Sequence, residues 1–94
     1  MGGKIYVTGG ASQGSTVNSV SVYDLQANAW TQLASMGTAR RAHASAAVGG
    51  KLYVFGGYDT GPLTTAEIYD PASNSWAQGP SLASARQDLA VVAL

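Results

Sequence analysis

The fold of this chain is decided by one stretch that occurs twice, GGKIYVTGG at residues 2–10 and GGKLYVFGG at residues 49–57. The two copies start 47 residues apart, which divides the 94-residue chain into two repeats, 2–48 and 49–94. A unit of this length cannot bury its own apolar faces, so it must stack on others of its kind. We therefore expect residues 1–94 to form a single unit of two stacked repeats.

The match extends beyond the glycine-rich stretches. Each repeat carries a Tyr, a Trp seven residues later and an Arg ten residues after the Trp. These residues are Tyr23, Trp30 and Arg40 in the first repeat and Tyr69, Trp76 and Arg86 in the second. The first repeat has one additional residue, which falls between its second glycine pair and the Tyr. This places the insertion in a loop (Ala11–Asn18 against Tyr58–Leu63), where changes in length are tolerated best.

Each repeat contains four short segments with the composition of β-strands, separated by Gly, Asp, Asn and Pro. The expected strands are Lys4–Thr8, Ser19–Tyr23, Ala29–Leu33 and His43–Val48, then Lys51–Phe55, Ala66–Tyr69, Ser75–Gln78 and Leu89–Leu94. No stretch has apolar residues at helical spacing, so the sequence predicts an all-β fold. Four strands in a unit of this length are typical of a propeller blade. The Ala-rich fourth strand suits the crowded position nearest the propeller axis.

The glycine pair after an apolar strand, followed by Tyr-Asp, Trp and Arg at these spacings, resembles the kelch repeat. The resemblance covers essentially the whole chain, twice and in the correct order. It implies a kelch-type β-propeller with two four-stranded blades per chain, whereas whole kelch propellers usually contain six or seven blades. It also implies protein binding through loops on one face, because most members of the family act in this way.

The composition excludes several classes of function. Five basic and five acidic residues give a formal net charge of zero, and the basic residues are dispersed, which argues against nucleic-acid binding. The absence of cysteine excludes disulfides and thiolate metal sites. No segment has the length and apolarity of a membrane span, and no signal peptide is evident. We expect no metal and no cofactor. The compartment is not determined, although a cytoplasmic or recombinant chain is favoured.

The position of the strands within the repeat predicts self-assembly. In kelch domains the strand after the Arg becomes the innermost strand of the following blade. The first repeat therefore lacks an innermost strand, and the strand at 87–94 lacks a blade. We expect 87–94 to complete the first blade of a neighbouring copy in a head-to-tail ring. Three copies would form a six-bladed homotrimer, although the pattern alone does not separate three copies from four.

The near-seamless division into two repeats also favours an engineered or excised two-blade piece. A different hypothesis is two blades of a larger natural propeller, without a function of their own. Charged residues amount to only 11% of the chain, which is consistent with much of its surface being covered by copies or a partner.

Residues that match between the repeats are assigned to the scaffold. They are Gly9, Gly10, Gly56, Gly57, Tyr23, Tyr69, Trp30, Trp76, Arg40 and Arg86. The glycines are expected to allow positive φ and close backbone approach, and the arginines to bond backbone carbonyls between blades. Residues that differ between the repeats are the candidates for ligand binding, because similar kelch domains line their binding mouth with the loops after the glycine pair and around the Arg. These candidates are Ser12, Gln13, Tyr58, Asp59, Thr60, Arg41, Gln87 and Asp88. Neutral drift or design choice in exposed loops explains them equally well.

The chain is expected to be non-enzymatic. The alternative is a small-molecule or sugar-processing enzyme that uses the central pocket of the propeller. A carboxylate pair for glycoside hydrolysis would have to consist of Asp59 and Asp88. The single histidine, His43, has no cysteine or acidic cluster near it in sequence, and is expected to be a strand residue at the central channel or its rim.

Overall fold

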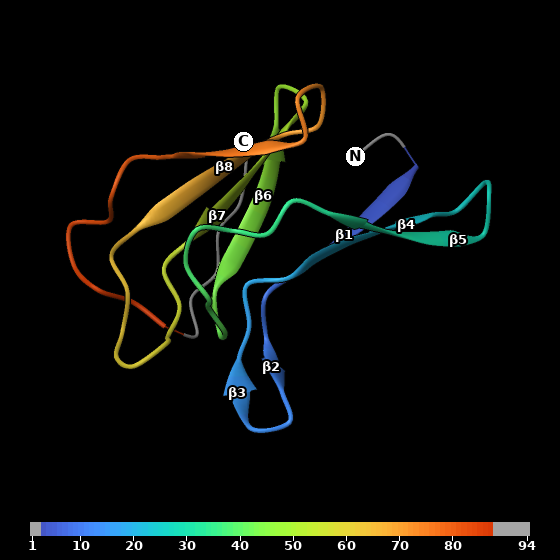
Figure 1. The fold of residues 1–94 in the computed structure, drawn as a ribbon. Helices are drawn as coiled ribbons and strands as arrows, with labels where there is room; N and C mark the ends of the chain where they lie inside the picture. Colours follow the sequence, from blue (N-terminus) through green and yellow to red (C-terminus); the bar gives the residue numbers. More distant parts are fainter. Residues whose placement is uncertain (1–2, 88–94) are drawn as a thin grey trace.

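The computed structural model describes residues 3–87, which form two antiparallel sheets and one small hairpin (Figure 1). The described residues contain no helix, so the predicted all-β fold is confirmed. Each sheet is built mainly from one sequence repeat, but the last strand of the first repeat belongs to the second sheet, which the chain reaches through residues 34–43.

The first sheet contains β1 (Lys4–Thr8), β4 (Val20–Asp24) and β5 (Ala29–Leu33), in the order β1-β4-β5. The turn between β4 and β5 forms because the Asp24 carboxylate accepts hydrogen bonds from the backbone N–H groups of Gln26 and Ala27. Asn28 completes the turn with a positive φ of 51° and accepts a hydrogen bond from the Tyr23 hydroxyl.

The second sheet contains four strands in chain order. They are β6 (Ala44–Val48), β7 (Lys51–Phe55), β8 (Ala66–Asp70) and β9 (Ser75–Gln78). The turn between β6 and β7 uses Gly49 and Gly50 at φ values of 58° and 77°. Residues with a Cβ atom are strained in this conformation, whereas glycine adopts it readily. The turn between β8 and β9 repeats the Asp–Asn chemistry of the first sheet, with Asp70 and Asn74 in the matching places.

The longer loop of the first repeat forms a small hairpin that the sequence pattern does not predict. Its strands, β2 (Ala11–Ser12) and β3 (Ser15–Thr16), contain two residues each. The turn between them holds Gln13 and Gly14 at φ values of 51° and 80°, as in the tight turns that suit hairpins. The corresponding loop of the second repeat, one residue shorter, forms no hairpin strands and has isolated bridges instead, one of them between Tyr58 and Pro62.

The first sheet has three strands because β6, which follows Arg40, pairs with β7 in the second sheet. This is the arrangement that the kelch resemblance implies for the strand after the Arg. The strand expected at Leu89–Leu94 lies outside the described residues. Within the described part of the chain, β1 is an edge strand paired on one side only, with β4.

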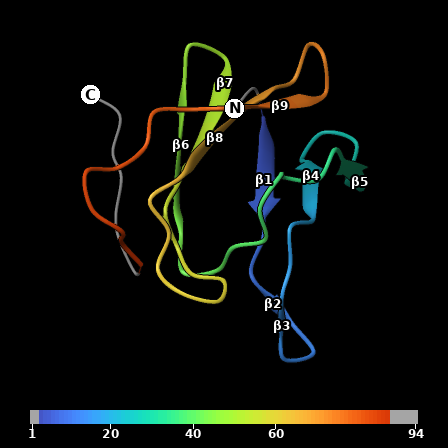
Figure 2. The same cartoon turned by 60° about the vertical axis from the view of Figure 1, so that its left-hand side comes forward.

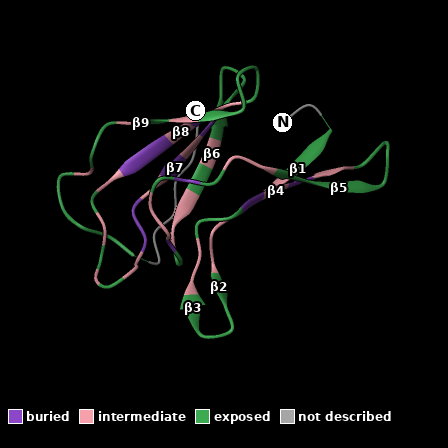
Figure 3. Cartoon of the chain, viewed as in Figure 1, coloured by how far each residue is buried: buried purple, intermediate pink, exposed green. Residues whose placement is uncertain are grey.

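The core lies between the two sheets. Buried residues gather on β7 and β8, whereas β1 and β5 are largely exposed (Figure 3). The core cluster consists of Val20, Met36, Leu52, Val54 and Tyr69, with Tyr6, Leu33 and Trp76 packed against it. Each repeat contributes apolar side chains to this cluster, so the stacking predicted from the repeat is what buries them.

Candidate functional site

A fully buried arginine joins the two sheets. Arg40 leaves the first repeat and points into the second, where one guanidinium nitrogen donates to the carbonyl oxygens of Gly56 (2.8 Å) and Thr65 (3.0 Å). The carbonyl contacts expected for Arg40 are therefore present. Its repeat-matched partner, Arg86, is exposed in the described structure.

Glu67 on β8 completes the environment of Arg40 and was not anticipated. Its Oε2 lies 2.8 Å from Arg40 Nη2 and also accepts the N–H of Thr38 at 3.1 Å. Its Oε1 accepts the N–H of Gly37 at 2.6 Å. The carboxylate thus balances the buried charge and bonds two backbone groups of the linking segment, which fixes this segment against the second sheet. Glu67 differs from its repeat-matched residue, Ser21, and that difference was a signal available in the sequence.

The glycine pairs let the linking segments approach the strand ends closely. Gly9 has a φ of 59°, and a Cβ atom there would lie 2.3 Å from the Arg40 carbonyl oxygen. At Gly56 a Cβ atom would lie 2.7 Å from the Arg86 carbonyl oxygen. The neighbouring glycines, Gly10 and Gly57, donate their N–H groups to the same two carbonyls. The expected positive φ and close backbone approach are both observed.

The paired aromatic residues have different surroundings in the two repeats. In the second sheet Tyr69 packs against Trp76 at a ring-centroid distance of 5.1 Å, and the Trp76 indole donates to the Ala34 carbonyl at 2.8 Å. Tyr69 also contacts Tyr6 across the sheets, and its burial raises its pKa. In the first sheet Tyr23 and Trp30 form the same pair at 5.1 Å, but Trp30 is mostly exposed because no sheet covers that face in the described structure.

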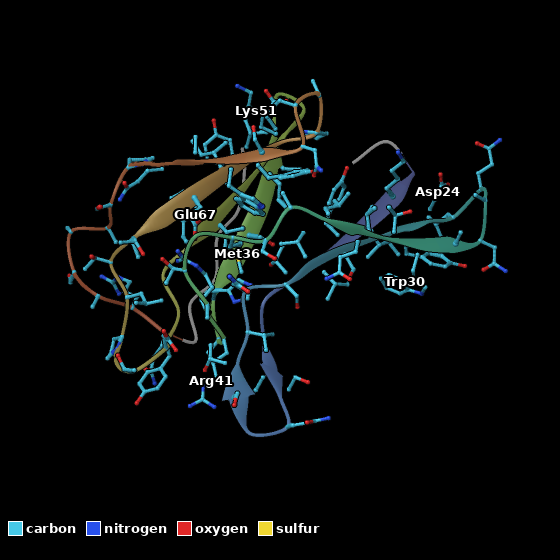
Figure 4. The ribbon with its side chains drawn as sticks, viewed as in Figure 1. Asp24, Trp30, Met36, Arg41, Lys51 and Glu67 are labelled. Atoms are coloured by element: carbon cyan, nitrogen blue, oxygen red, sulfur yellow. The ribbon has the colours of Figure 1, made fainter. Side chains whose placement is uncertain are left out.

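Two of the predicted ligand-binding residues come together at one end of the sheets. Arg41 and Tyr58 exchange backbone hydrogen bonds of 3.0 and 2.8 Å. The Arg41 guanidinium carbon lies 5.1 Å from the centre of the Tyr58 ring, which is a cation–π contact. Arg41 is exposed and lies beside the β2–β3 hairpin, at the end of the molecule opposite Lys51 (Figure 4).

The other candidates occupy the surrounding loops. Ser12 and Gln13 lie exposed at the hairpin tip, and Thr60 and Gln87 are also exposed. Asp59 is half-buried, and its N–H donates to the Gly61 carbonyl at 3.1 Å. Asp88 lies outside the described residues. Figures 1 and 2 both show the hairpin, the loop between β7 and β8 and the approach to β6 at the same end of the sheets.

His43 lies between the two sheets, just behind this loop cluster. Its Nε2 is 2.8 Å from Thr8 Oγ1, its ring lies close to Gly9, and its Cα and Cβ atoms lie close to Gly57. Burial lowers the pKa of His43, the positive charge of Arg40 lowers it further, and a hydrogen bond with Thr8 opposes both. Nδ1 is buried without a partner among the described residues. The imidazole therefore connects β1 to the residue just before β6, and burial favours its neutral form. His43 itself precedes β6 and does not lie in the strand, contrary to expectation.

A cavity of about 430 Å³ opens beside the Arg40–Glu67 pair and is walled by Trp76, Thr38 and Gln78. Of the described residues that line it, Glu67 alone is charged, and both of its carboxylate oxygens are already bonded to the protein. Asp59 does not line it. Among residues 3–87 no group of three or more His, Asp or Glu side chains could hold a metal ion. No helix in the described part of the chain is long and apolar enough to cross a membrane.

Stacked antiparallel blades, with Arg, Tyr and Trp between them and glycine pairs at the strand ends, define a repeat protein of the β-propeller type. The family model of the KLHDC2/KLHL20/DRC7 Kelch-repeats domain matches residues 1–92. The chain therefore belongs to the kelch-repeat family, as its sequence motifs indicate.

Curated relatives share the repeat over part of their length. Kelch-like protein 26 of Danio rerio is 39% identical over 56 residues, which cover 60% of this chain and 9% of the relative. An F-box/kelch-repeat protein of Arabidopsis thaliana is 39% identical over 70 residues (69% of this chain, 15% of the relative). Kelch-like protein 21 of Danio rerio is 43% identical over 60 residues (64% and 10%). The match thus spans between 9% and 15% of the length of these relatives.

Proposed function

We propose that this chain is a self-assembling, non-enzymatic kelch propeller scaffold that binds a protein or peptide through the loops at one end of its blades. Three copies would form a six-bladed ring. The kelch-repeat family supports the binding role, because its members commonly act as protein-interaction scaffolds. The assembly role is supported by the unequal burial of the two sheets.

The unequal burial concerns matching residues on matching strands. Ile5 and Val7 on β1 are 50% and 48% exposed, whereas Leu52 and Val54 at the same places on β7 are 6% and 0% exposed. Trp30 is 61% exposed, although Trp76 is packed against the core. The side of the second sheet that carries these residues is covered by the first repeat. The matching side of the first sheet is exposed to solvent. This observation carries the proposal.

Burying the rest of these three side chains would favour association. Complete burial of a large apolar side chain contributes about 1.5–3 kcal/mol, so the exposed halves contribute on the order of 1 kcal/mol each. Association also costs translational and rotational freedom. The contact therefore needs further bonds, which the edge strand β1 can supply.

The expected strand at Leu89–Leu94 would add to β1 of a neighbouring copy in the way that β6 adds to β7. In that sheet Ala44 pairs with Phe55 and Val48 pairs with Lys51. By the repeat, the same register would place Ala90 opposite Thr8 and Leu94 opposite Lys4 of the neighbouring copy. Such a strand would cover an edge that is otherwise open to uncontrolled pairing.

The binding face is proposed from the Arg41–Tyr58 pair. A guanidinium held over an aromatic ring by paired backbones presents a cation and an apolar surface at little entropic cost. The hairpin tip, Thr60 and Gln87 would surround it, and Asp59 would add a carboxylate. Assembly would repeat this constellation once per copy around one mouth. The enzyme alternative gains no support from this cavity, because Asp59 does not line it and Asp88 lies outside the described residues.

Native mass spectrometry and sedimentation of the 94-residue chain test the assembly. We expect a species of three times the 9.6 kDa monomer mass. Trp30→Ala should shift this species toward monomer, whereas Leu25→Ala should not, because Leu25 is equally exposed but lies in the β4–β5 turn. A dominant monomer at micromolar concentration would reject self-assembly, and a fourfold mass would reject the trimer alone.

Selection of peptides on the assembled protein tests the binding face. Selected peptides should lose affinity when Tyr58→Ala or Arg41→Ala is introduced and keep it with Lys51→Ala at the opposite end. Peptides that are insensitive to both loop variants would place the binding surface elsewhere.

A further inference from the structure

The described chain has two faces that no other part of it covers. Each of them matches, through the sequence repeat, one of the two surfaces that pack together inside the chain. The first half, the receiving face, is formed by Ile5, Val7, Ser21, Tyr23 and Trp30. These residues share one side of the first sheet, because Ile5 pairs with Tyr23, Val7 with Ser21 and Tyr23 with Trp30. They match Leu52, Val54, Glu67, Tyr69 and Trp76, which contact the first repeat inside one copy.

The second half, the inserting face, is formed by Tyr53, Pro80, Leu82 and Arg86 of the second repeat. They match Tyr6, Ala34, Met36 and Arg40 of the first repeat, all of which contact the second sheet. Met36 and Arg40 are completely buried in that contact, whereas Leu82 is half-buried and Arg86 is exposed. The inserting face thus has the types of side chain that pack against a sheet in the internal contact, but no sheet of the described structure packs against it.

We infer that a second copy of this chain occupies the receiving face with its inserting face, and that Ser21 makes this contact weaker than the contact inside each copy. The inference rests on the proposed self-assembly. In the contact between copies, Arg86 takes the place of Arg40 and donates to the carbonyls of Gly9 and Ser19. The Trp30 indole donates to the Pro80 carbonyl, as the Trp76 indole donates to Ala34.

The contact between the two sheets of one copy contains the Glu67 carboxylate, and the proposed contact between copies has no such group. Glu67 pairs with Arg40 and accepts the N–H groups of Gly37 and Thr38. At the matching place Ser21 has a short, neutral side chain, so Arg86 of the neighbouring copy is buried with neutral acceptors only. A buried guanidinium without a counter-charge is costly. The assembly should therefore separate between copies before it separates between the sheets of one copy.

Ser21→Glu restores the missing group and tests the inference. We expect the assembly to persist to about tenfold lower protein concentration in a sedimentation dilution series, as a coupling between charges in contact allows. Ser21→Gln adds similar volume without charge and should give no such gain. In an Arg86→Gln background, Ser21→Glu should also give no gain, because its partner is missing.

The outcomes separate the inference from the proposed function. If Ser21→Glu still assembles as a trimer but shows no gain over Ser21→Gln, the copies meet through other residues and this inference is wrong while self-assembly stands. An equal gain with Arg86→Gln would overturn the pairing of these two positions. A wild-type chain that stays monomeric at every concentration would overturn the self-assembly itself.

Discussion

Removal of the Glu67 carboxylate is expected to cost this chain a large part of its stability. Glu67→Ala leaves Arg40 completely buried and without a counter-charge, and leaves the N–H groups of Gly37 and Thr38 without their acceptor. Breaking a buried ion pair in this way costs about 3–5 kcal/mol. A small domain has only about 5–15 kcal/mol in total. We therefore expect a variant close to the limit of folding.

Urea denaturation followed by tryptophan fluorescence and circular dichroism measures the effect. The midpoint should fall strongly for Glu67→Ala with little change in slope, since the surface exposed on unfolding is nearly the same. Glu67→Gln should be milder, because its amide oxygen can still accept a backbone N–H. These measurements belong at a single protein concentration, because assembly would also add to the stability.

A double-mutant cycle separates the charge pair from general disruption. Arg40→Met combined with Glu67→Met removes both charges at once and should cost less than the sum of the single changes, because neither charge is left buried alone. The reasoning would be refuted if Glu67→Ala changed the free energy of unfolding by less than about 1 kcal/mol. Additive single changes would show that the two side chains are not coupled.

The remaining predictions concern a histidine, a glycine and a tryptophan. His43 has a pKa lowered below its ordinary value of 6.5, so the unfolded chain binds a proton more readily. The free energy of unfolding should then be greatest above a pH of about 6.5 and fall as the pH drops below this value. In urea titrations at several pH values, His43→Gln should reduce this dependence. Gly9→Ala should destabilise by more than about 1 kcal/mol in the same assay, because its Cβ would meet a carbonyl oxygen at 2.3 Å. Gly61→Ala, with open space around it, is the matched control and should be nearly neutral. Dilution of the assembly should increase acrylamide quenching of Trp30, and unchanged quenching would mean that no copy covers it.

Most of the strands could be predicted because the repeat shows each pattern twice. Lys4–Thr8, Lys51–Phe55, Ala29–Leu33 and Ser75–Gln78 have the predicted bounds, since Gly, Asp and Asn mark their ends chemically. The β2–β3 hairpin was missed, because strands of two residues have no periodicity to read. The hairpin depends on the positive φ values of Gln13 and Gly14 rather than on an alternation of apolar and polar residues.

The candidate site was less predictable, because residues that differ between the repeats occur in strands as well as in loops. In the loops after the glycine pairs and around the Arg, these differences include Arg41 and Tyr58, which lie in contact. In the strands they include Glu67, whose match in the first repeat is Ser21. The exposure of Trp30 could not follow from matching with Trp76, because burial depends on whether a sheet stands on that side.

The passage of the chain after Arg40 into the next sheet means that the sequence repeat and the blade are offset by one strand. A duplication that copied any 46 or 47 consecutive residues would therefore insert a complete blade whose first strand is already tied to its predecessor by the peptide chain. Blade number in such a protein could grow by tandem gene duplication without the invention of a new linker, wherever the duplication happened to begin.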